Sequence, residues 1–525
     1  MRIARLILSG WACLCLSSAM CIPISAKDLG QTQTAMWRVI EWRAEAKDYS
    51  DNPFDVAAEV TFTHDDTGEK RTTQMFYDGD NTWRFRFTGT GAGQWRFASE
   101  SKVAALNELT GSIQVTENRD LRIKGFLTNV GNKFAVQVKD ASDLQAYIFN
   151  VYMSRVKHPA YLDEFGPDLQ DVRKKTQGYF EDAMANGFEI IFIHVNNNWL
   201  KLGVREHDKH KSENPDPAAF AALEEIITTV HRLGGRVHIW AWGDESRKWT
   251  PRGLPGGING QADRRLQRYI AARLGPMPGW TMGYGFDLHE WTNVEQLNSW
   301  AEYLHEHFGW QHLLCARGQI LKGPHNINSY DGFGRDVPLT TTAHGPADYA
   351  EIVEDLAGDT NRPHLYEERH SYKRSGFDLD MDGTRRLLWR ESMAGGMGGF
   401  FGFYPDSPHP YPKPQQLRTH YDFWHKNDRL AFDMEPANEL IEGGCALLSP
   451  STGRCIFYKE DADTIRMNLS RFPGPHKAVA VDATGPLGEF SAGSFAPTDH
   501  IWTWNAPARS DWVLIVDKCY TKNQR

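Results

Sequence analysis

A chain of 525 residues is too long for one compact core, so its length predicts two or three domains. Hydrophobic residues make up 41% and charged residues 24%, as in ordinary globular proteins, and 18 tryptophans suit either large cores or surfaces that stack on flat ligands. The formal net charge of −9, without any basic run, argues against nucleic acids or anionic membranes as partners.

The first 26 residues are typical of an export signal. Arg2 and Arg5 precede an apolar run over residues 6–21, and residues 24–26 (Ile-Ser-Ala) offer a small-residue cleavage site. This run is short for a membrane span, and nothing later in the sequence resembles one. We therefore expect a secreted or periplasmic protein that does not bind membranes.

Residues 27–118 are expected to form an N-terminal β-sandwich. Short alternating segments, such as residues 56–63 and 82–87, are separated by Gly- and Asp-containing turns such as residues 65–68. Strands at this spacing are typical of an immunoglobulin-like sandwich of roughly 85 residues.

Between residues 119 and 430, strands alternate with long helical patterns, which indicates a parallel β/α sheet. Eight units in roughly 290 residues fit a (β/α)8 barrel, which commonly takes about 250 residues. Helices are expected at residues 168–186, 217–233, 293–308 and 384–394. Strands are expected at residues 146–153, 188–195, 236–242, 280–284, 312–316, 339–343, 363–367 and 397–404.

Residues 431–525 lose the helical period, and short strands separated by Gly, Pro and Asp turns predict a second, small β-sandwich. Cys445 and Cys455 flank one of these turns, so a disulfide across a hairpin and two unpaired core thiols are both open. Cys315 and Cys519 lack any metal-ligand spacing and are interpreted as packing residues.

The carboxyl ends of barrel strands converge on one face, so residues far apart in sequence can share a site there. Acids, amides and aromatic residues at these ends describe a sugar site better than a nucleotide site. No GxGxxG or Walker loop follows any strand, so we expect no cofactor. The side chains expected at this face are His194, Asn197, Trp199, Trp242, Asp244, Asp287, His289, Glu290, Arg317, Glu367, Glu368, Arg369 and Tyr404.

Two segments invite a metal interpretation, and we expect neither to bind one. Residues 378–383 copy the first half of a calcium loop, but Trp389 stands where such a loop needs Glu. Asp382 is instead expected to cap the following helix. His207, Asp208 and His210 lie in a charged segment that is typical of a hydrated loop.

Several motifs resemble one family. FYDGDNTWRFRFTGTGAGQWRF resembles the sandwich domain that precedes the catalytic barrel in many secreted glycoside hydrolases. RPHLYEERHSY and FDLDMDGTRRLLWRESMAGGMGGFFGFYP resemble the seventh and eighth strands of apiosidase-like hydrolases, and GEFSAGSFAPTDHIWTWNAPARSDWVLIV resembles the small β domain that follows them. Acids after the fourth and seventh strands resemble clan A of the glycoside hydrolases. The resemblance covers most of residues 35–518.

The resemblance implies a retaining hydrolase that acts on a poly- or oligosaccharide, with Glu367 as nucleophile and Glu290 as acid/base. Glu368 is the alternative nucleophile, and Asp287 is the alternative to Glu290. His289 departs from the clan pattern, because it stands where the clan has an Asn that binds the sugar 2-hydroxyl.

Two other functions stay open at this point. A non-catalytic carbohydrate-binding protein is motivated by the departure at His289. A polysaccharide lyase would use His194 or Tyr366 as its base. The sequence leaves the oligomeric state undetermined.

Overall fold

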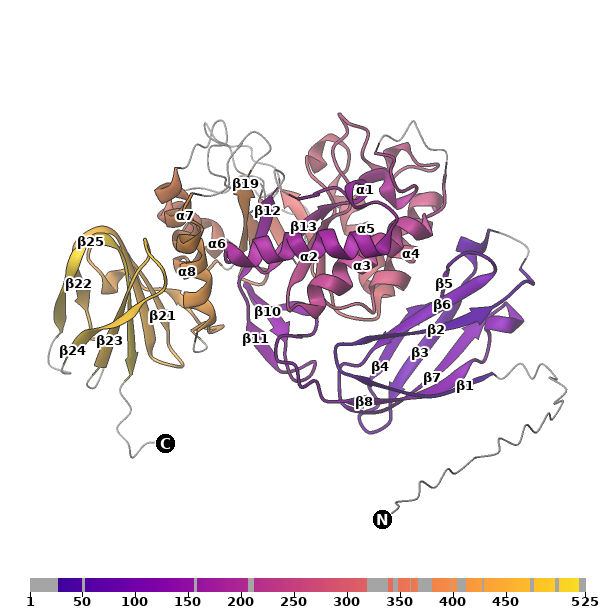
Figure 1. Cartoon of the computed structure of the whole chain (residues 1–525), viewed down its shortest axis with the longest axis horizontal. Coiled ribbons are helices and arrows are strands. Elements are labelled where there is room, and N and C mark those ends of the chain that lie inside the picture. The colour runs from indigo at the N-terminus through magenta and orange to yellow at the C-terminus, as the bar shows by residue number, and fades with distance from the viewer. Residues whose placement is uncertain are drawn as a thin grey trace, which may run out of the picture.

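The computed structural model describes residues 27–49, 52–154, 158–205, 212–318, 339–342, 348–358, 360–366, 380–396, 398–403, 412–426, 429–472, 476–495 and 500–518. In these ranges the side chains of residues 154, 289, 317–318, 339–342, 400–403 and 518 are not described. A mixed α/β centre carries one β-rich part on each side (Figure 1).

The N-terminal part consists of two facing sheets. The five-stranded sheet has the order β1-β8-β7-β3-β4, with β1 (Asp28–Ala35), β3 (Ala58–His64), β4 (Lys70–Gln74), β7 (Gly93–Ser101) and β8 (Thr110–Thr116). The three-stranded sheet has the order β2-β6-β5, with β2 (Val39–Glu45), β5 (Phe76–Tyr77) and β6 (Thr82–Thr88). Trp42 stacks on Phe85 at 5.1 Å within the second sheet and reaches Phe97 of the first at 5.0 Å. This aromatic layer makes the two-sheet sandwich that the alternating segments predicted.

The centre is a closed barrel of eight parallel strands, in which β12 pairs with β19 to complete the ring. Each strand overlaps one that the sequence predicted, because strands buried on both sides read as apolar runs. The strands are β12 (Phe149–Ser154), β13 (Ile190–His194), β14 (Arg236–Trp240), β15 (Trp280–Gly283), β16 (Leu314–Gly318), β17 (Leu339–Thr342), β18 (His364–Tyr366) and β19 (Gly398–Phe403).

Side-chain caps set the starts of several barrel helices. Asp168, Asp216 and Asn293 each accept a backbone N–H from the first turn of the helix that follows. Asp380, and not the predicted Asp382, caps α7, since it accepts the N–H of Gly383 at 2.6 Å. The helices are α1 (Leu162–Phe165), α2 (Leu169–Ala185), α3 (Pro217–Arg232), α4 (Gln261–Leu274), α5 (Val294–Phe308), α6 (Tyr349–Ala357), α7 (Met381–Met393) and α8 (Pro414–His425).

A small antiparallel sheet that the sequence did not predict closes the amino-terminal end of the barrel. It consists of β9 (Leu127–Val130), β10 (Lys133–Gln137) and β11 (Leu144–Ala146). Phe134 stacks on Phe149, the first residue of β12, with ring centroids 4.8 Å apart. A Cβ at Gly398 would lie 2.6 Å from the Phe134 ring, so the close approach of this sheet requires glycine there.

The sandwich docks on the barrel helices through buried charges and one inserted tryptophan. Glu224 of α3 pairs with Arg86 of β6 at 2.8 Å and with Arg273 of α4 at 2.5 Å. Burial works to raise the pKa of Glu224, but the two guanidinium groups outweigh it and lower that pKa to about 2. Trp310, which follows α5, is inserted into the sandwich core and donates its indole N–H to the carbonyl of Thr88 at 2.9 Å.

The C-terminal part differs from the predicted sandwich. Its described strands pair into one six-stranded sheet, in the order β20-β21-β22-β25-β23-β24. The second layer on one face comes from the barrel, because Trp389 of α7 stacks on Tyr458 of β22 at 5.6 Å. The strands are β20 (Glu435–Pro436), β21 (Cys445–Ser449), β22 (Arg454–Asn468), β23 (His476–Asp482), β24 (Glu489–Phe495) and β25 (Ile501–Lys518).

Cys445 and Cys455 lie in the predicted hairpin but are both free. The register pairs Cys445 with Tyr458 and Cys455 with Leu448, so the two thiols do not face each other. They also join different apolar clusters, one against the barrel and one in the C-terminal core. Of the two alternatives that the sequence left open, the structure therefore has the two unpaired thiols.

Within the described ranges, no helix is long and apolar enough to span a membrane. The same residues contain no group of three or more His, Cys, Asp or Glu side chains arranged to hold a metal ion. Residues 207–210 and 378–379 of the two possible metal segments lie outside the described residues.

Candidate active site

An aromatic floor lies at the carboxyl-terminal mouth of the barrel. His194, the last residue of β13, is 1% exposed, and its ring stacks on Tyr161 at 4.6 Å. Trp240, the last residue of β14, lies 4.8 Å from the same imidazole in an edge-to-face arrangement, and Phe286 lies 5.1 Å from Trp240. Among these four residues the sequence predicted only His194, which the structure places at the expected face.

The loop after β14 carries a fixed guanidinium over this floor. Asp244 accepts the backbone N–H of Arg247 at 2.8 Å and the Arg247 Nη1 at 2.6 Å. The Arg247 guanidinium lies 5.1 Å from the Trp249 ring centroid and 5.6 Å from that of Phe286. Asp244, predicted to contact substrate, thus positions Arg247, whose side chain is half exposed.

The three asparagines after β13 form part of the 3-10 turn Asn196–Trp199 and are fully buried. Asn197, a predicted binding residue, donates its side-chain N–H groups to the carbonyls of Arg205 and Lys248. Asn198 donates to the carbonyl of Val195 and accepts from the N–H of Gly203. These two side chains therefore hold the loops at the mouth in place.

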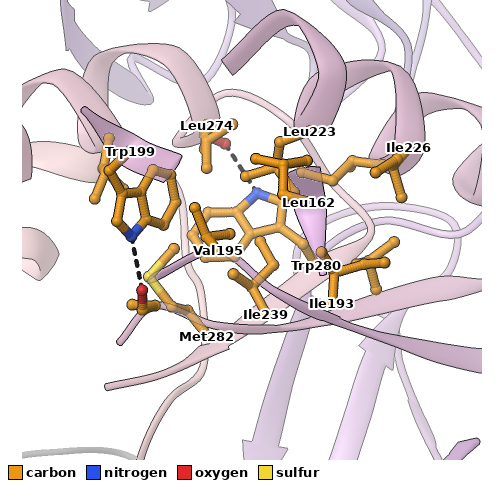
Figure 2. Close-up of a cluster of buried hydrophobic side chains, with 14 of the residues drawn as sticks. Leu162, Ile193, Val195, Trp199, Leu223, Ile226, Ile239, Leu274, Trp280 and Met282 are labelled. Carbon is orange, nitrogen blue, oxygen red and sulfur yellow. Dashed lines mark hydrogen bonds between the residues drawn. The ribbon is translucent and has the colours of Figure 1, made fainter. Parts of the chain in front are cut away.

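Trp199 and Trp242 were expected at the mouth but lie in the layer between the strands and the helices. Trp199 is 0% exposed and donates its indole N–H to the carbonyl of Ala241 at 2.8 Å. Figure 2 shows Trp199 and Trp280 in the same apolar cluster, together with Val195 and Met282. The reason is the geometry of the chain, since the 3-10 turn and the end of β14 at Trp240 direct both tryptophans outward.

Asp287 and Glu290 follow β15 at the predicted end of the barrel. Asp287 is half-buried beside Phe286 and adopts a left-handed conformation, with φ of 49°. Glu290 is exposed at the rim, in the 3-10 turn Leu288–Glu290. It lines a polar cavity of about 480 Å³ together with Arg252, which donates to the Glu290 carbonyl at 3.3 Å.

Asp263 of α4 supports the loop that borders this cavity. Its carboxylate accepts the N–H of Asn259 at 2.8 Å and the Nε2 of Gln267 at 2.9 Å. Complete burial raises the pKa of Asp263 to about 6, against the lowering effect of these hydrogen bonds. It was not recognised in the sequence, because nothing in the sequence distinguishes it from the exposed acids of a helix start.

The remaining candidates are not placed by the structure. Glu367, Glu368, Arg369 and Tyr404 lie outside the described residues, and so do the side chains of His289 and Arg317. Just before them on β18, Leu365 belongs to a buried cluster that contains Trp240 and also residues of the C-terminal sheet. Tyr366, the possible lyase base, faces outward, where its hydroxyl donates to Asp355 of α6 at 2.9 Å.

The arrangement is an aromatic floor with a rim of acids, amides and one fixed guanidinium. Aromatic faces and hydrogen-bonding polar groups are what a site for a sugar ring offers. The described part of the mouth therefore suits a neutral or polar ring-shaped ligand better than a long apolar one.

Comparisons with known proteins agree with the fold. Residues 33–102 match a family described as a domain of unknown function (DUF5060). Among curated proteins, none matches this chain. The chain is similar to a candidate glycoside hydrolase from Bacteroides vulgatus ATCC 8482, with a TM-score of 0.69 and 16% identity over 93% of this chain and 100% of that one.

Two further solved structures have the same architecture over a smaller share of the chain. One is a family 5 glycoside hydrolase from the same organism, with a TM-score of 0.56 and 12% identity over 77% of this chain and 94% of that one. The other is described as a glycoside hydrolase, with a TM-score of 0.54 and 13% identity over 76% of this chain and 98% of that one. At these identities the chain shares the fold of glycoside hydrolases, a (β/α)8 barrel with added β-rich parts.

Proposed function

We propose that this chain is a secreted glycoside hydrolase of the apiosidase-like, clan A type that cleaves a glycosidic bond in a poly- or oligosaccharide. The observation that carries the proposal is the mouth of the barrel. There an aromatic floor of His194, Trp240 and Phe286 adjoins a rim with the acids Asp287 and Glu290. The shared fold with proteins described as glycoside hydrolases supports the proposal.

The proposed reaction is a retaining double displacement. The Glu367 carboxylate attacks the anomeric carbon and forms a glycosyl ester, while the Glu290 carboxyl gives its proton to the leaving glycosidic oxygen. Glu290 then takes a proton from water, and the resulting attack on the anomeric carbon releases the sugar and restores the Glu367 carboxylate. A separation of about 5 to 5.5 Å between the two carboxyl groups is expected for this mechanism.

The alternation of side chains along a strand favours Glu367 over Glu368 as nucleophile. Tyr366 faces α6, so its strand neighbour Leu365 faces the barrel interior. Residues two apart along a strand share a face, so the proposal places the nucleophile two residues after Leu365. This argument rests on the strand period, and it makes Glu368 the control for Glu367.

Secretion is proposed from the first 26 residues. Arg2 and Arg5 with the apolar run behind them would direct export, and cleavage after Ala26 would leave a chain that starts one residue before β1. Amino-terminal sequencing of the protein recovered from the periplasm or medium measures this cleavage directly.

Substitution of the two glutamates tests the proposed chemistry. Plant and algal polysaccharides are first screened with the wild type for released reducing ends. On the best substrate, Glu290→Gln and Glu367→Gln are each expected to lower kcat by at least about 100-fold, since each loses an essential acid or nucleophile. Glu368→Gln and Glu295→Gln, the latter an exposed acid of α5 next to the rim, serve as matched controls.

The outcomes separate the assignments. Full activity in both Glu290→Gln and Glu367→Gln would show that the carboxylate pair is wrong, and loss in Asp287→Asn but not in Glu290→Gln would move the acid/base role to Asp287. An unsaturated product that absorbs in the ultraviolet would show a lyase. Binding of polysaccharide in calorimetry without any cleavage would show a non-catalytic protein.

A further inference from the structure

The side chain of Asn196 is buried without a hydrogen bond. Asn196 is 0% exposed, and neither its Nδ2 nor its Oδ1 has a partner. An amide can make up to four hydrogen bonds, so both its donor and its acceptor capacity are unused. Its neighbour Asn198, equally buried, uses both ends of its amide.

The backbone at Asn196 is also unusual. Its φ is 54°, in the left-handed region that few residues other than glycine adopt without cost. The N–H groups of Val195 and Asn196 bond to two consecutive carbonyls, those of Trp240 at the end of β14 and of Ala241 just after it. The backbone therefore leaves the strand conformation directly after β13, with Val195 in the right-handed helical region and Asn196 in the left-handed one.

The position of Asn196 is the mouth of the barrel. It lies two residues beyond His194, and the loop after β14 covers it. A Cβ on Gly243 would be 3.3 Å from the Asn196 Oδ1 and 2.8 Å from the Trp249 side chain, so only glycine lets the loop close this tightly. The loop is held by the bond from Gly243 N–H to the Trp249 carbonyl at 2.7 Å and by the Asn197 amide on the Lys248 carbonyl at 3.1 Å, so its displacement breaks these bonds.

Leaving a buried amide unsatisfied costs stability, and a left-handed asparagine adds strain. Glycine at position 196 would avoid both costs, because it adopts positive φ freely and carries no polar side chain. A local arrangement that lowers stability without a compensating contact is expected where a ligand supplies the missing contact.

We infer that Asn196 is a substrate-binding residue of the proposed hydrolase, whose amide hydrogen-bonds a sugar hydroxyl once the loop of residues 243–249 is displaced. A hydroxyl both donates and accepts hydrogen bonds. Two neighbouring sugar hydroxyls could therefore accept from the Asn196 Nδ2 and donate to its Oδ1. The inference rests on the proposed function. It adds a substrate contact after the second strand of the barrel to the proposed catalytic acids after the fourth and seventh strands.

The test is Asn196→Gly, which keeps the backbone conformation and removes the amide. We expect its melting temperature to equal or exceed that of the wild type, while kcat/KM on the best substrate of the polysaccharide screen falls at least roughly tenfold. If Asn196 were only structural, its substitution would not lower kcat/KM in a variant that is as stable as the wild type. The matched control is Asn81→Gly, a left-handed asparagine of the sandwich with φ of 57°, which is expected to leave kcat/KM unchanged.

Asn196→Asp tests the donor, because the carboxyl group keeps an acceptor oxygen but has no NH₂ group. A larger loss at pH 8 than at pH 5 is expected, since ionisation removes the remaining donor. Unchanged kcat/KM in Asn196→Gly would overturn the inference and leave a trapped water as the partner of the amide.

Failure of the proposed function gives a different pattern. If the wild type cleaves nothing, calorimetric binding of the same polysaccharides replaces the rate measurement. The inference then stands only if Asn196→Gly binds the polysaccharide more weakly than the wild type and Asn81→Gly binds it equally well. Absence of binding by the wild type would overturn both proposals.

Discussion

At the amino-terminal end of the barrel, Phe134 and Phe149 stack face to face, and the buried Lys133 ammonium donates to the Gly395 carbonyl at 2.6 Å. At the opposite end, Asn196 keeps an unused amide in a left-handed backbone, and half-exposed Arg247 lies over aromatic rings. The amino-terminal end is closed by stacked rings and a hydrogen-bonded ammonium, whereas the opposite end carries an unbonded amide and a half-exposed guanidinium.

This difference agrees with the division of labour in (β/α)8 barrels, where the amino-terminal face supports stability and the carboxyl-terminal face carries the chemistry. It implies that substitutions at the closed end lower the free energy of unfolding and leave catalysis intact. Substitutions at the mouth are expected to do the reverse.

The largest expected effect is the loss of stability in Phe134→Ala. Removing a fully buried ring that packs on Phe149 is expected to lower the free energy of unfolding by about 3–5 kcal/mol. Denaturant unfolding measures it, and kcat per folded molecule should stay at the wild-type value. Val130→Ala, on the exposed edge of the same small sheet, is the control and should change stability by less than about 0.5 kcal/mol. A large fall in kcat of folded Phe134→Ala would break the comparison.

The second prediction concerns the pH dependence that Lys133 gives to the closed end. Burial lowers the pKa of Lys133 from 10.5 to about 8, and Glu435 opposes this only in part. Between these values the unfolded chain holds a proton that the folded chain lacks, so the free energy of unfolding rises with pH, by up to about 3 kcal/mol.

Lys133→Met should remove this rise. Unfolding curves of the wild type and the variant from pH 7 to 10.5 are compared, because other groups titrate equally in both. If the difference in free energy of unfolding between the wild type and Lys133→Met does not grow with pH, the ammonium is not desolvated.

A smaller stability effect, but a larger effect on activity, is expected at the mouth. Asp244→Asn replaces an acceptor of the Arg247 guanidinium by a donor and releases the cation from Trp249 and Phe286. Because Arg247 is half exposed, the stability loss should be about 1 kcal/mol or less. On the proposed substrate KM should rise at least about threefold, as measured by initial rates. A variant that is unstable and retains its KM would place Asp244 with the structural residues.

The last prediction is that reduction of the protein has no effect on its stability. Strand β21 packs behind the closed end, where the Leu447 side chain lies 3.9 Å from the Cβ position of Gly395. Cys445 and Cys455 are free, so a reducing agent should leave the melting temperature unchanged. A drop on reduction would show that a covalent link supports this end.

Most strands of the barrel could be predicted because they are apolar runs with a breaker behind them, as in residues 188–194 before the asparagines, whereas β17 (Leu-Thr-Thr-Thr) is only weakly marked. Helix α4 was not predicted, because its apolar period is interrupted by arginines that the fold buries. Arg265 pairs with Asp55 of the sandwich at 2.6 Å, and Arg273 pairs with Glu224. These partners are distant in sequence, and no local pattern indicates them.

The candidate site was predicted at the level of strand ends and not of side chains. Strand β14 ends at Trp240, two residues before the predicted end, which placed Trp242 at the mouth in error. In the same way, the cysteine pairing depended on a hairpin register that loop length alone does not fix. The Trp242 error comes from a shift of two residues along a correctly predicted strand.

Trp310 gives the molecule an order of assembly. The strands of the sandwich end at Thr116, yet Trp310 packs against Phe62 and Phe87 in the sandwich core. During synthesis, the sandwich strands leave the ribosome long before the tryptophan that fills their core. The first domain to emerge therefore lacks one of its core side chains until half of the barrel has been made.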